Sequence, residues 1–404
     1  MLSTLIYRSR ARGDIDQASL AAIVRQAQTR NAQMQVSGIL VFDGHQFLQV
    51  LEGPLSSVEA LFARISKDER HDLVVELMRD YAPRRHFENV GMTLFDLRDA
   101  KAHAVLKSVV QSSVVPFSLA REARVYKFIR SFLGCPDSQQ IAREFQPDAW
   151  RVESLPSRPQ PASPPAVHNA TCQFALQPIV APLAGKIKAY EALIRTADGG
   201  SPAAWFAALS GDALYEADLH AKDAAFALAK AVNIGSHMIS VNLLPGSLVR
   251  VPDAVAILLS QIARHGLLPQ QVIIEITESE VITHFETFEH VIRQLRAAGI
   301  NLAIDDFGAG FAGLSLLTRF QPGLIKIDRS IVTDIHLYGP KQAIVYGILR
   351  SCAELEITVV AEGVEKVEEW CWLTAAGIKY FQGYLFARPA LNCAPPVSWP
   401  VTGV

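Results

Sequence analysis

Apolar and polar positions near the start of the chain follow two different periods. Strand-like runs cover Leu2–Tyr7, Gly38–Phe42, Gln46–Leu51 and Leu73–Asp80. Leu20–Asn31 and Val58–Ser66 instead carry apolar residues at helical spacing. Asp43-Gly44, between the second and third runs, is a typical hairpin turn. The order strand, helix, strand, strand, helix, strand predicts an α+β domain with the ferredoxin-like arrangement.

The pattern changes beyond residue 167, where short apolar runs end in a polar or charged residue. These runs are MISVNL, QVIIEIT, INLAIDDFG, LIKID, ITVVAEG and IKYFQG, and helical stretches such as FETFEHVIRQLRAAG lie between them. Strands that alternate with helices predict parallel βα units, and the length suits one α/β (β/α)₈ barrel of the TIM type. An open doubly wound sheet is the main alternative, but no GxGxxG follows the first strand of this region.

A proline-rich segment, Ser154–Ala166, separates the two patterns. Five of its residues are proline, which is typical of an extended, semi-rigid linker. The stretch from about Asp99 to Arg143 is expected to be helical. The predicted organisation is therefore an α+β domain at residues 1–97, a helical connector at 98–153, the linker at 154–166 and the barrel at 167–404.

Composition excludes several classes of protein. The 404 residues include 38 Lys and Arg against 40 Asp and Glu, so the net charge of -2 argues against binding to duplex nucleic acid. No charge-free, proline-free apolar run reaches the roughly 18 residues of a membrane helix, and the first apolar run is too short for a secretory signal. The five cysteines (Cys135, Cys172, Cys352, Cys371 and Cys393) form no CxxC, which favours structural thiols in a reduced, cytoplasmic protein.

Polar residues recur at the carboxyl ends of the predicted barrel strands, where barrel enzymes hold their active sites. They are Glu191, Asn242, Glu275, Asp305, Asp306, Lys326, Glu362 and Gln382. Like charges placed around one axis repel unless a cation lies between them, and oxygen ligands suit Mg²⁺ or Mn²⁺. The adjacent acids Asp305 and Asp306 could face two such ions, with one acid bridging, which is an arrangement suited to cleaving a phosphodiester. Lys326 could orient the attacking water or stabilise the transition-state charge.

Each of these residues alone has an ordinary structural interpretation. A single Glu at a strand end is usually a helix cap or a surface acid, and Asn242 could cap the next helix. Asp306-Phe307-Gly308 could be only a turn, and Lys326 could pair with Asp328. The recurrence at the same end of successive strands favours a common site.

The same residues resemble the signatures of the EAL family. Glu191-Ala192-Leu193-Ile194-Arg195 is similar to the motif that gives the family its name, and the following family motifs appear in order up to Gln382-Gly383-Tyr384. The resemblance covers roughly Thr171–Pro389 and implies hydrolysis of cyclic di-GMP to linear pGpG. One departure is Ala309, where the family usually has Thr.

The resemblance also implies roles for individual residues. Glu191, Asn242, Glu275 and Asp305 would hold one divalent metal, and Asp305, Asp306 and Glu362 the other. Lys326 and Gln382 would act on the water and the metal-bound solvent, while Arg195 and Leu193 would contact the substrate, Arg195 at a phosphate. Glu278 would steady the loop after Asp306, which in this family helps to form a dimer. A homodimer through the barrels is therefore expected.

Several residues of the N-terminal domain have ordinary interpretations as well. Tyr7 is by default a core aromatic residue, Asn31 a helix C-cap and Met92 a gap-filling side chain. Gln49 is different, because an amide within the apolar strand FLQVLEG needs a buried polar partner.

These residues together resemble the BLUF family of blue-light sensors over about Met1–Phe95. The resemblance implies a noncovalent FAD between two helices, with Tyr7 and Gln49 hydrogen-bonded to each other and to the flavin. Asn31 would hold the polar edge of the ring, Arg30 would approach the cofactor and Met92 would report the change. Many members carry Trp at the position of Val90, so a Trp-dependent relay is not expected.

The joint interpretation is a blue-light-regulated cyclic di-GMP phosphodiesterase. A barrel that binds cyclic di-GMP without cleaving it is the first alternative. A second alternative, a redox flavoenzyme at the N-terminus, would need a nicotinamide-binding fingerprint, which the sequence lacks. A third, a sugar or aldol enzyme on the barrel, would need a Schiff-base Lys or a pair of acids without a metal cluster. The sequence leaves open the direction of the light effect and the choice between Mg²⁺ and Mn²⁺.

Overall fold

The computed structural model describes residues 2–82, 85, 87, 91–112, 122–134, 145–153, 172–207, 209–277, 285–310, 317 and 322–402. Glu278, Val90, Cys135 and the proline-rich segment lie outside the described residues. The chain divides into two compact units, and each is described by itself. No helix in the described ranges is long and apolar enough to cross a bilayer.

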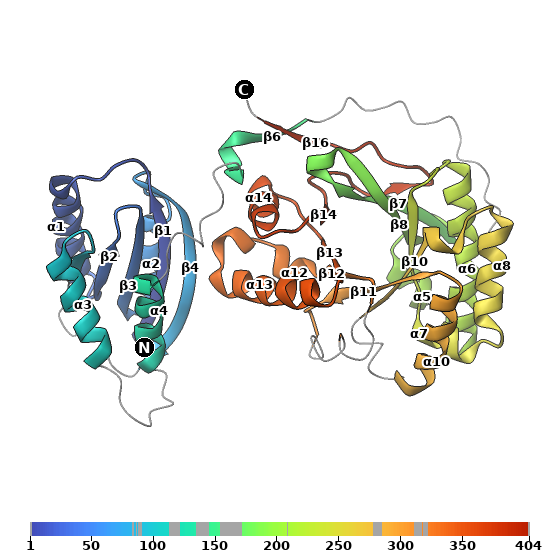
Figure 1. The fold of residues 1–404 in the computed structure, drawn as a ribbon, viewed down its shortest axis with the longest axis horizontal. Helices are drawn as coiled ribbons and strands as arrows, with labels where there is room; N and C mark the ends of the chain where they lie inside the picture. The colour runs from blue at the N-terminus through green and yellow to red at the C-terminus, as the bar shows by residue number, and fades with distance from the viewer. Residues whose placement is uncertain are drawn as a thin grey trace. The chain divides into compact units, whose positions relative to one another are not determined.

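The N-terminal unit is built on a five-stranded sheet (Figure 1). Its strands are β1 (Leu2–Ala11), β2 (Ser37–Phe42), β3 (Gln46–Pro54), β4 (His71–Ala82) and β5 (Thr93–Asp96). Their order across the sheet is β4-β1-β3-β2-β5, which confirms the ferredoxin-like arrangement of the first four. The sequence did not predict β5, because it has only four residues and no buried one among them.

Helices cover both faces of this sheet. Helix α1 (Gln17–Gln33) and helix α2 (Leu55–Ile65) pack on the face that carries Leu5 and Tyr7. Helix α3 (Ala100–Ser112) and helix α4 (Glu122–Gly134) pack on the face that carries Ile6. Because side chains alternate along a strand, one strand supplies both cores. A cofactor held on the first face therefore lies between α1 and α2.

The C-terminal unit is a closed barrel of eight strands. They are β7 (Cys172–Ala181), β8 (Lys186–Thr196), β9 (Met238–Asn242), β10 (Val272–Thr277), β11 (Asn301–Phe307), β12 (Leu324–Ile327), β13 (Thr358–Ala361) and β14 (Tyr380–Phe381). Neighbouring strands pair in chain order, and β14 closes the barrel on β7. A short strand, β15 (Ala390–Leu391), adds to the outer edge of β7. The predicted barrel is confirmed.

One barrel strand departs from the parallel pattern that the sequence predicted. Strand β7 runs antiparallel to β8, while β8 through β14 are mutually parallel. The reason is the connection, which consists of the 3₁₀ turn η3 (Pro182–Ala184) and Gly185 with φ of 59°. A parallel crossover needs a dozen or more residues, so this short connection forces a hairpin.

Helices of the barrel unit lie between its strands in chain order (Figure 1). They are α5 (Pro202–Ala207), α6 (Asp212–Ala231), α7 (Pro245–Arg250), α8 (Ala254–Arg264), α10 (Phe285–Ala297), α12 (Arg329–Val332), α13 (Gly339–Glu354) and α14 (Val367–Ala375). The 3₁₀ turn η4 (Pro269–Gln271) completes the connections, while residues 335–343, which include the 3₁₀ turn η5 (Ile335–Leu337) and the start of α13, belong to the N-terminal unit.

An apolar layer fills the barrel interior, and each strand contributes one side chain to it. Its members are Ile179, Ala189, Met238, Ile273, Ala303, Leu324, Val360 and Tyr380. Side chains two positions apart on a strand point to the same side. The residues two positions beyond this layer must therefore also face the barrel axis, nearer to the carboxyl ends of the parallel strands.

A two-stranded sheet fixes the chain on the barrel before the proline-rich segment begins. Strand β6 (Trp150–Glu153), preceded by the 3₁₀ turn η2 (Pro147–Ala149), pairs antiparallel with β16 (Trp399–Thr402). The ring of Trp150 also packs edge-to-face on Trp370 of α14, with 4.8 Å between the ring centroids. The predicted helical connector is thus helical over α3 and α4, and its last residues form a strand of the barrel unit.

Candidate functional site

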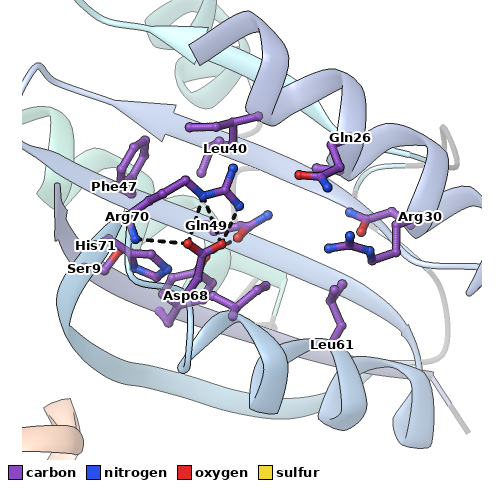
Figure 2. A pocket seen from close by; sticks show the side chains of 15 residues that line it. Ser9, Gln26, Arg30, Leu40, Phe47, Gln49, Leu61, Asp68, Arg70 and His71 are labelled. Atoms are coloured by element: carbon purple, nitrogen blue, oxygen red, sulfur yellow. Dashed lines mark hydrogen bonds and ion pairs between the residues drawn. The ribbon is translucent and has the colours of Figure 1, made fainter. Parts of the chain in front are cut away.

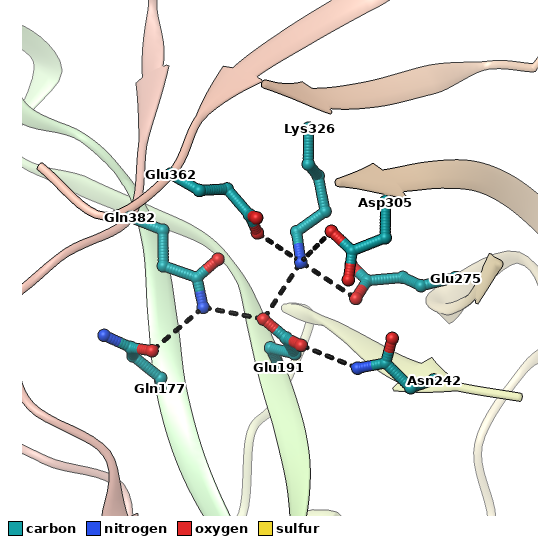
Figure 3. Close-up of polar contacts among 8 residues, drawn as sticks. All are labelled: Gln177, Glu191, Asn242, Glu275, Asp305, Lys326, Glu362 and Gln382. Atoms are coloured by element: carbon teal, nitrogen blue, oxygen red, sulfur yellow. Dashed lines mark hydrogen bonds and ion pairs between the residues drawn. The ribbon is translucent and has the colours of Figure 1, made fainter. Parts of the chain in front are cut away.

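A layer of polar side chains lies next to the apolar layer inside the barrel, nearer to the carboxyl ends of the parallel strands. Its members lie two positions from the apolar layer, toward the carboxyl end of β8 to β14 and toward the amino end of the antiparallel β7. They are Gln177, Glu191, Ser240, Glu275, Asp305, Lys326, Glu362 and Gln382. Figure 3 shows these side chains, apart from Ser240, converging from the surrounding strands together with Asn242. The structure therefore brings together the acids, the lysine and the two amides that the sequence placed at strand ends.

Lys326 occupies the centre of this layer. Its Nζ atom lies 3.0 Å from Glu191, 2.9 Å from Glu275 and 3.2 Å from Asp305, and it also pairs with Glu362. Lys326 is fully buried, and Glu275 is only 1% exposed. The sequence-based alternative of a surface pair between Lys326 and Asp328 is wrong, since Asp328 instead caps α12 by accepting a hydrogen bond from the Ser330 backbone.

Burial and charge oppose each other in this cluster. Burial alone would lower the pKa of Lys326, but the surrounding carboxylates raise it well above its ordinary value. Burial and the charge of Glu191 raise the pKa of Glu275, and burial likewise raises the pKa of Glu362. Burial alone would raise the pKa of Glu191 too. The positive charge of Lys326 and the hydrogen bond from Gln382 outweigh this effect and hold the pKa of Glu191 below its ordinary value. One ammonium group does not balance this much negative charge.

Two groups of carboxylates offer metal-ligating atoms within 4.8 Å of one another. Glu191, Glu275 and Asp305 form the first group, and Asp305, Asp306 and Glu362 form the second. Asp305 belongs to both, as a bridging ligand would. Asn242 lies beside the first group, where its Nδ2 atom donates to Oε1 of Glu191 at 2.8 Å. This donor set of hard oxygens fits two divalent cations of the Mg²⁺ or Mn²⁺ type.

Asp306 differs from its neighbours in backbone and exposure. It has a φ of 53°, in the left-handed region that Asp tolerates better than most residues, and its carbonyl accepts the Ala309 backbone N–H at 3.1 Å. Its side chain is exposed, yet the left-handed backbone interrupts strand alternation here, and the carboxylate offers a ligand atom within 4.8 Å of those of Asp305 and Glu362. Burial and the charge of Asp305 raise the pKa of Asp306 to about 6. A cation beside it would restore the charged form.

The remaining predicted contacts of the barrel lie at the end of β8. Leu193 and Arg195 are both partly exposed, and Arg195 donates through Nη1 to the carbonyl of Ile194 at 2.8 Å. Its remaining guanidinium donors could bind a phosphate. Glu278, predicted to steady the loop after Asp306, lies outside the described residues.

Sequence reasoning missed two elements of this site. Gln177 of β7 joins the polar layer from the antiparallel strand, where it donates to the Ala387 carbonyl at 3.0 Å. Asp218 of α6 is 1% exposed and accepts hydrogen bonds from Ser247 Oγ and from the Leu244 backbone, at 2.7 and 2.9 Å. Asp218 thereby fixes the turn that follows Asn242. The available signal in the sequence was the helical spacing, since Asp218 lies three positions before Ala221 and seven before Ala225 and so falls on an apolar helix face.

The N-terminal unit contains a second polar site between α1 and α2. Tyr7 donates from its hydroxyl to Oε1 of Gln49, and Nε2 of Gln49 lies 3.4 Å from the sulfur of Met92. All three side chains are at most 5% exposed. Burial raises the pKa of the Tyr7 phenol above its ordinary value, and the carboxylate of Asp68 adds to this. Tyr7 is therefore neutral at physiological pH.

A pocket that is partly open to solvent is lined by Tyr7 and Gln49 (Figure 2). Helix α1 contributes Arg30 and Asn31 to its wall, and Asp68 and Arg70, which form an ion pair, also line it.

The pocket carries three buried polar atoms that lack a hydrogen-bond partner in the part of the chain that the structure describes. Asn31 Nδ2, Ser9 Oγ and His71 Nδ1 are buried and make no hydrogen bond to any described residue. Buried polar groups are nearly always paired in proteins, so these atoms indicate a missing polar ligand. A planar ring with hydrogen-bonding edges, such as a flavin, fits this combination of apolar walls and unpaired donors. Val90, at the position where many BLUF proteins carry Trp, lies outside the described residues.

Two family models match the chain. One is described as "EAL domain" and matches residues 162–389, which is more than half of the 404 residues. The other is described as "Sensors of blue-light using FAD" and matches residues 2–93.

Similar proteins have been named for different activities. The blue light- and temperature-regulated antirepressor BluF of Escherichia coli (strain K12) is 43% identical over 400 residues, which are 99% of each chain. The cyclic di-GMP phosphodiesterase PdeR of the same organism is 41% identical over 116 residues, covering 29% of this chain and 18% of PdeR. A solved structure of Klebsiella pneumoniae BlrP1, a manganese and cyclic di-GMP complex at pH 6, has a TM-score of 0.90 and 46% identity over 100% of both chains.

Proposed function

The chain belongs to the EAL family and carries a BLUF domain at its N-terminus, and we propose on this premise that it is a blue-light-regulated hydrolase of cyclic di-GMP. The observation that carries the proposal is the pair of carboxylate groups that share Asp305 around a buried lysine. Water would attack one phosphorus of the cyclic dinucleotide, and the bond to the 3′ oxygen would break. The product would be linear 5′-pGpG.

The residues of the polar layer fit two divalent cations. Glu191, Asn242, Glu275 and Asp305 would hold one, and Asp305, Asp306 and Glu362 the other. When bound, such a pair supplies Lewis-acid chemistry that activates water and neutralises charge on the phosphate. Mg²⁺ and Mn²⁺ both suit this oxygen shell.

Three further side chains would act directly on the reacting groups. The Lys326 ammonium, held among four carboxylates, would donate a hydrogen bond to the attacking water or to the phosphate oxygens as negative charge develops. Gln382 would accept a hydrogen bond from water at the same centre. Arg195 would bind a phosphate of the substrate through its fork of donors, beside Leu193 on the same strand.

We also propose that the N-terminal pocket binds FAD and senses light. Asn31 would donate to the polar edge of the isoalloxazine, Arg30 would approach the cofactor from α1, and Tyr7 and Gln49 would contact the ring. When bound, the flavin would supply the light-absorbing group, Tyr7 would lie beside it as the electron donor, and the Gln49 amide would be the group whose hydrogen bonds change in the light. Met92, already in contact with Gln49, is placed to respond to that change.

Turnover under light and in the dark tests both halves of the proposal. Purified, flavin-loaded protein is incubated with cyclic di-GMP and Mg²⁺ or Mn²⁺, and chromatography identifies the product. Formation of pGpG at unequal rates in light and dark is expected. The absence of pGpG with either metal would reject the hydrolase, and equal rates would reject the light control alone.

A second candidate function is light-dependent binding of cyclic di-GMP without its hydrolysis. The similarity to BluF, named an antirepressor, favours it because that likeness spans nearly the whole chain. A hydrolase and a binding protein differ in the behaviour of Glu191→Ala. If the wild type turns over and the variant binds cyclic di-GMP without cleaving it, the hydrolase holds. If both bind and neither cleaves, the binding function holds.

We further propose a cytoplasmic homodimer that assembles through the barrels. The four cysteines in the described ranges are free thiols, as expected in a reducing compartment. Light scattering coupled to size-exclusion chromatography measures the assembly state, and a monomer at all concentrations would contradict the dimer.

A further inference from the structure

Gln177 sits at the edge of the polar layer, where no role has yet been assigned to it. It is 8% exposed, and its position on β7 pairs in register with Glu191 on β8. Its side chain makes two hydrogen bonds, of which Figure 3 shows the one with Gln382. Nε2 donates to the backbone carbonyl of Ala387 at 3.0 Å, and Oε1 accepts from Nε2 of Gln382 at 3.2 Å.

The Ala387 carbonyl fixes which way the Gln177 amide points. A carbonyl oxygen can only accept, so the partner that faces it must be the amino group of Gln177. The oxygen of Gln177 then necessarily faces Gln382, which must present its own amino group. That amino group also donates to Oε2 of Glu191 at 2.8 Å. One backbone carbonyl therefore sets the orientation of two consecutive side-chain amides.

The consequence appears on the other side of Gln382. Its Oε1 atom is buried and accepts no hydrogen bond from any described residue, although the side chain is only 3% exposed. Figure 3 shows this oxygen on the side of the amide that faces away from Gln177 and toward Glu362. A buried amide oxygen is normally paired, so this acceptor indicates a hydrogen-bond donor that is not among the described residues.

We propose that Gln177 is a positioning residue that holds the oxygen of Gln382 toward the metal and water site. With the amide reversed, an amino group would face the bound cations, and an oxygen would face the carboxylate of Glu191. Both contacts would be repulsive. The proposal rests on the proposed two-cation hydrolase, and it assigns Gln177 an effect that acts only through Gln382.

The ordinary alternative is that Gln177 only satisfies the Ala387 carbonyl. A Gln177→Met variant removes both hydrogen bonds at similar side-chain length. Gln261→Met is the matched control, because Gln261 on α8 is 4% exposed and also donates to a backbone carbonyl, that of Leu219, away from the acids. The melting temperature of each variant is also measured, because it reports the loss of stability that follows from removing a buried hydrogen bond.

The test measures Mn²⁺ affinity by calorimetry and steady-state turnover for Gln177→Met, Gln382→Met and the double variant. Loss of a residue that orients groups around a metal typically lowers metal affinity or activity by about 10- to 100-fold. We expect a loss of about 10-fold in Mn²⁺ affinity and in kcat for Gln177→Met, with KM unchanged. The double variant should be no weaker than Gln382→Met, and Gln261→Met should bind Mn²⁺ like the wild type.

Several outcomes would overturn the proposal. Wild-type Mn²⁺ affinity and kcat in Gln177→Met would do so, as would an increase in KM alone, which would indicate direct substrate contact. Additive losses in the double variant would also contradict action through Gln382. If Gln177→Met does not fold, Gln177→Glu replaces it, because a carboxylate oxygen can still accept the hydrogen bond from Gln382. This variant should retain more Mn²⁺ affinity than Gln382→Met. An equal loss of Mn²⁺ affinity in the two variants would overturn the proposal.

The Mn²⁺ titration separates this proposal from the proposed function. A wild type that binds Mn²⁺ but forms no pGpG would reject the hydrolase, while the affinity series still decides the role of Gln177. A wild type that binds no Mn²⁺ would overturn both.

Discussion

The Nζ atom of Lys326 lies 3.0 Å from Oε2 of Glu191, and both side chains are buried in the barrel. The same ammonium pairs with three further carboxylates, so among the described residues one positive charge faces four acidic groups. The metal-free barrel therefore has an incompletely neutralised centre. Its stability and its cation affinity are linked, because any cation that binds there also removes repulsion from the fold.

Lys326→Met should destabilise the metal-free protein and make it depend on added cations. Removing one partner of a buried ion pair lowers the free energy of unfolding by about 3–5 kcal/mol. Mn²⁺ should recover part of this loss, which is measured by urea unfolding with chelator or with Mn²⁺. Lys222→Met is the matched control, because Lys222 is paired with buried Asp218 outside the carboxylate cluster and should show no rescue by metal. Equal behaviour of the two variants would contradict the prediction.

Glu275→Gln should separate stability from metal binding. Burial and the charge of Glu191 raise the pKa of Glu275, so its charged form is disfavoured in the absence of metal, and a neutral amide of similar shape removes that cost. We expect the free energy of unfolding in chelator to equal or exceed that of the wild type. Mn²⁺ affinity should fall by at least about 10-fold, since the amide is a weaker ligand than the carboxylate. Calorimetry and urea unfolding measure the two quantities, and a large loss of metal-free stability would refute this interpretation of the charge.

Cation binding should weaken on acidification through the range in which Asp306 titrates. The pKa of Asp306 is raised to about 6, so the carboxylate is charged above that pH and protonated below it. A metal must displace the proton, and Mn²⁺ affinity should therefore fall by up to about 10-fold per pH unit below pH 6. Titrations at several pH values test this, with Asp306→Asn as the control that should bind weakly with a shallower pH dependence. A wild-type affinity that stays constant down to about pH 5 would exclude this contribution.

Tyr7→Phe should keep the flavin and lose the response to light. The substitution removes the hydroxyl that donates to Gln49 but leaves the ring that packs on Phe62 at 5.4 Å between centroids. We expect unchanged flavin content, no light-induced red shift of the absorption spectrum, and equal turnover in light and dark. Tyr126→Phe, on α4 at the opposite face of the sheet, is the control and should retain the spectral shift. A normal red shift in Tyr7→Phe would remove Tyr7 from the photochemistry.

A break in the proline-rich segment should not release the N-terminal unit. Both flanks of this segment are fixed in the barrel unit, by β6 on one side and by β7 on the other. A protease site introduced within 154–166 should therefore give two fragments that stay together in size-exclusion chromatography. Trp150→Ala, which removes the ring packed on Trp370, should promote their separation. Immediate separation of the fragments with Trp150 intact would show that β6 does not hold them.

The period of two along the strands explains why so much of the site could be predicted from sequence. Each acid of the polar layer lies two positions beyond an apolar residue that points inward, so the run of apolar residues already marks the side on which Glu275 and Asp305 lie. Gln177 could not be found this way, because its strand runs in the opposite direction and places it two positions before Ile179. The direction of β7 depends on the short turn before β8, and no hydrophobic pattern encodes it.

Other features depended on contacts distant in sequence. Strand β5 is short and half-exposed, and it exists because β2 offers it a free edge. Strand β6 pairs with residues almost 250 positions away, which no local pattern reveals. The Tyr7, Gln49 and Met92 contacts follow from three separate segments, and only the buried amide within an apolar strand gave a local signal.

The reversed direction of β7 also determines where the chain enters the barrel. Cys172, the first residue of β7, pairs with Thr196 at the carboxyl end of β8. An all-parallel barrel would receive its chain at the amino end of the strands, remote from the chemistry. Here the entry point lies at the same rim as the acids, and Gln177 follows five residues later on the same strand. A pull or twist applied to the incoming polypeptide would therefore reach the catalytic end of the barrel before any other part of it.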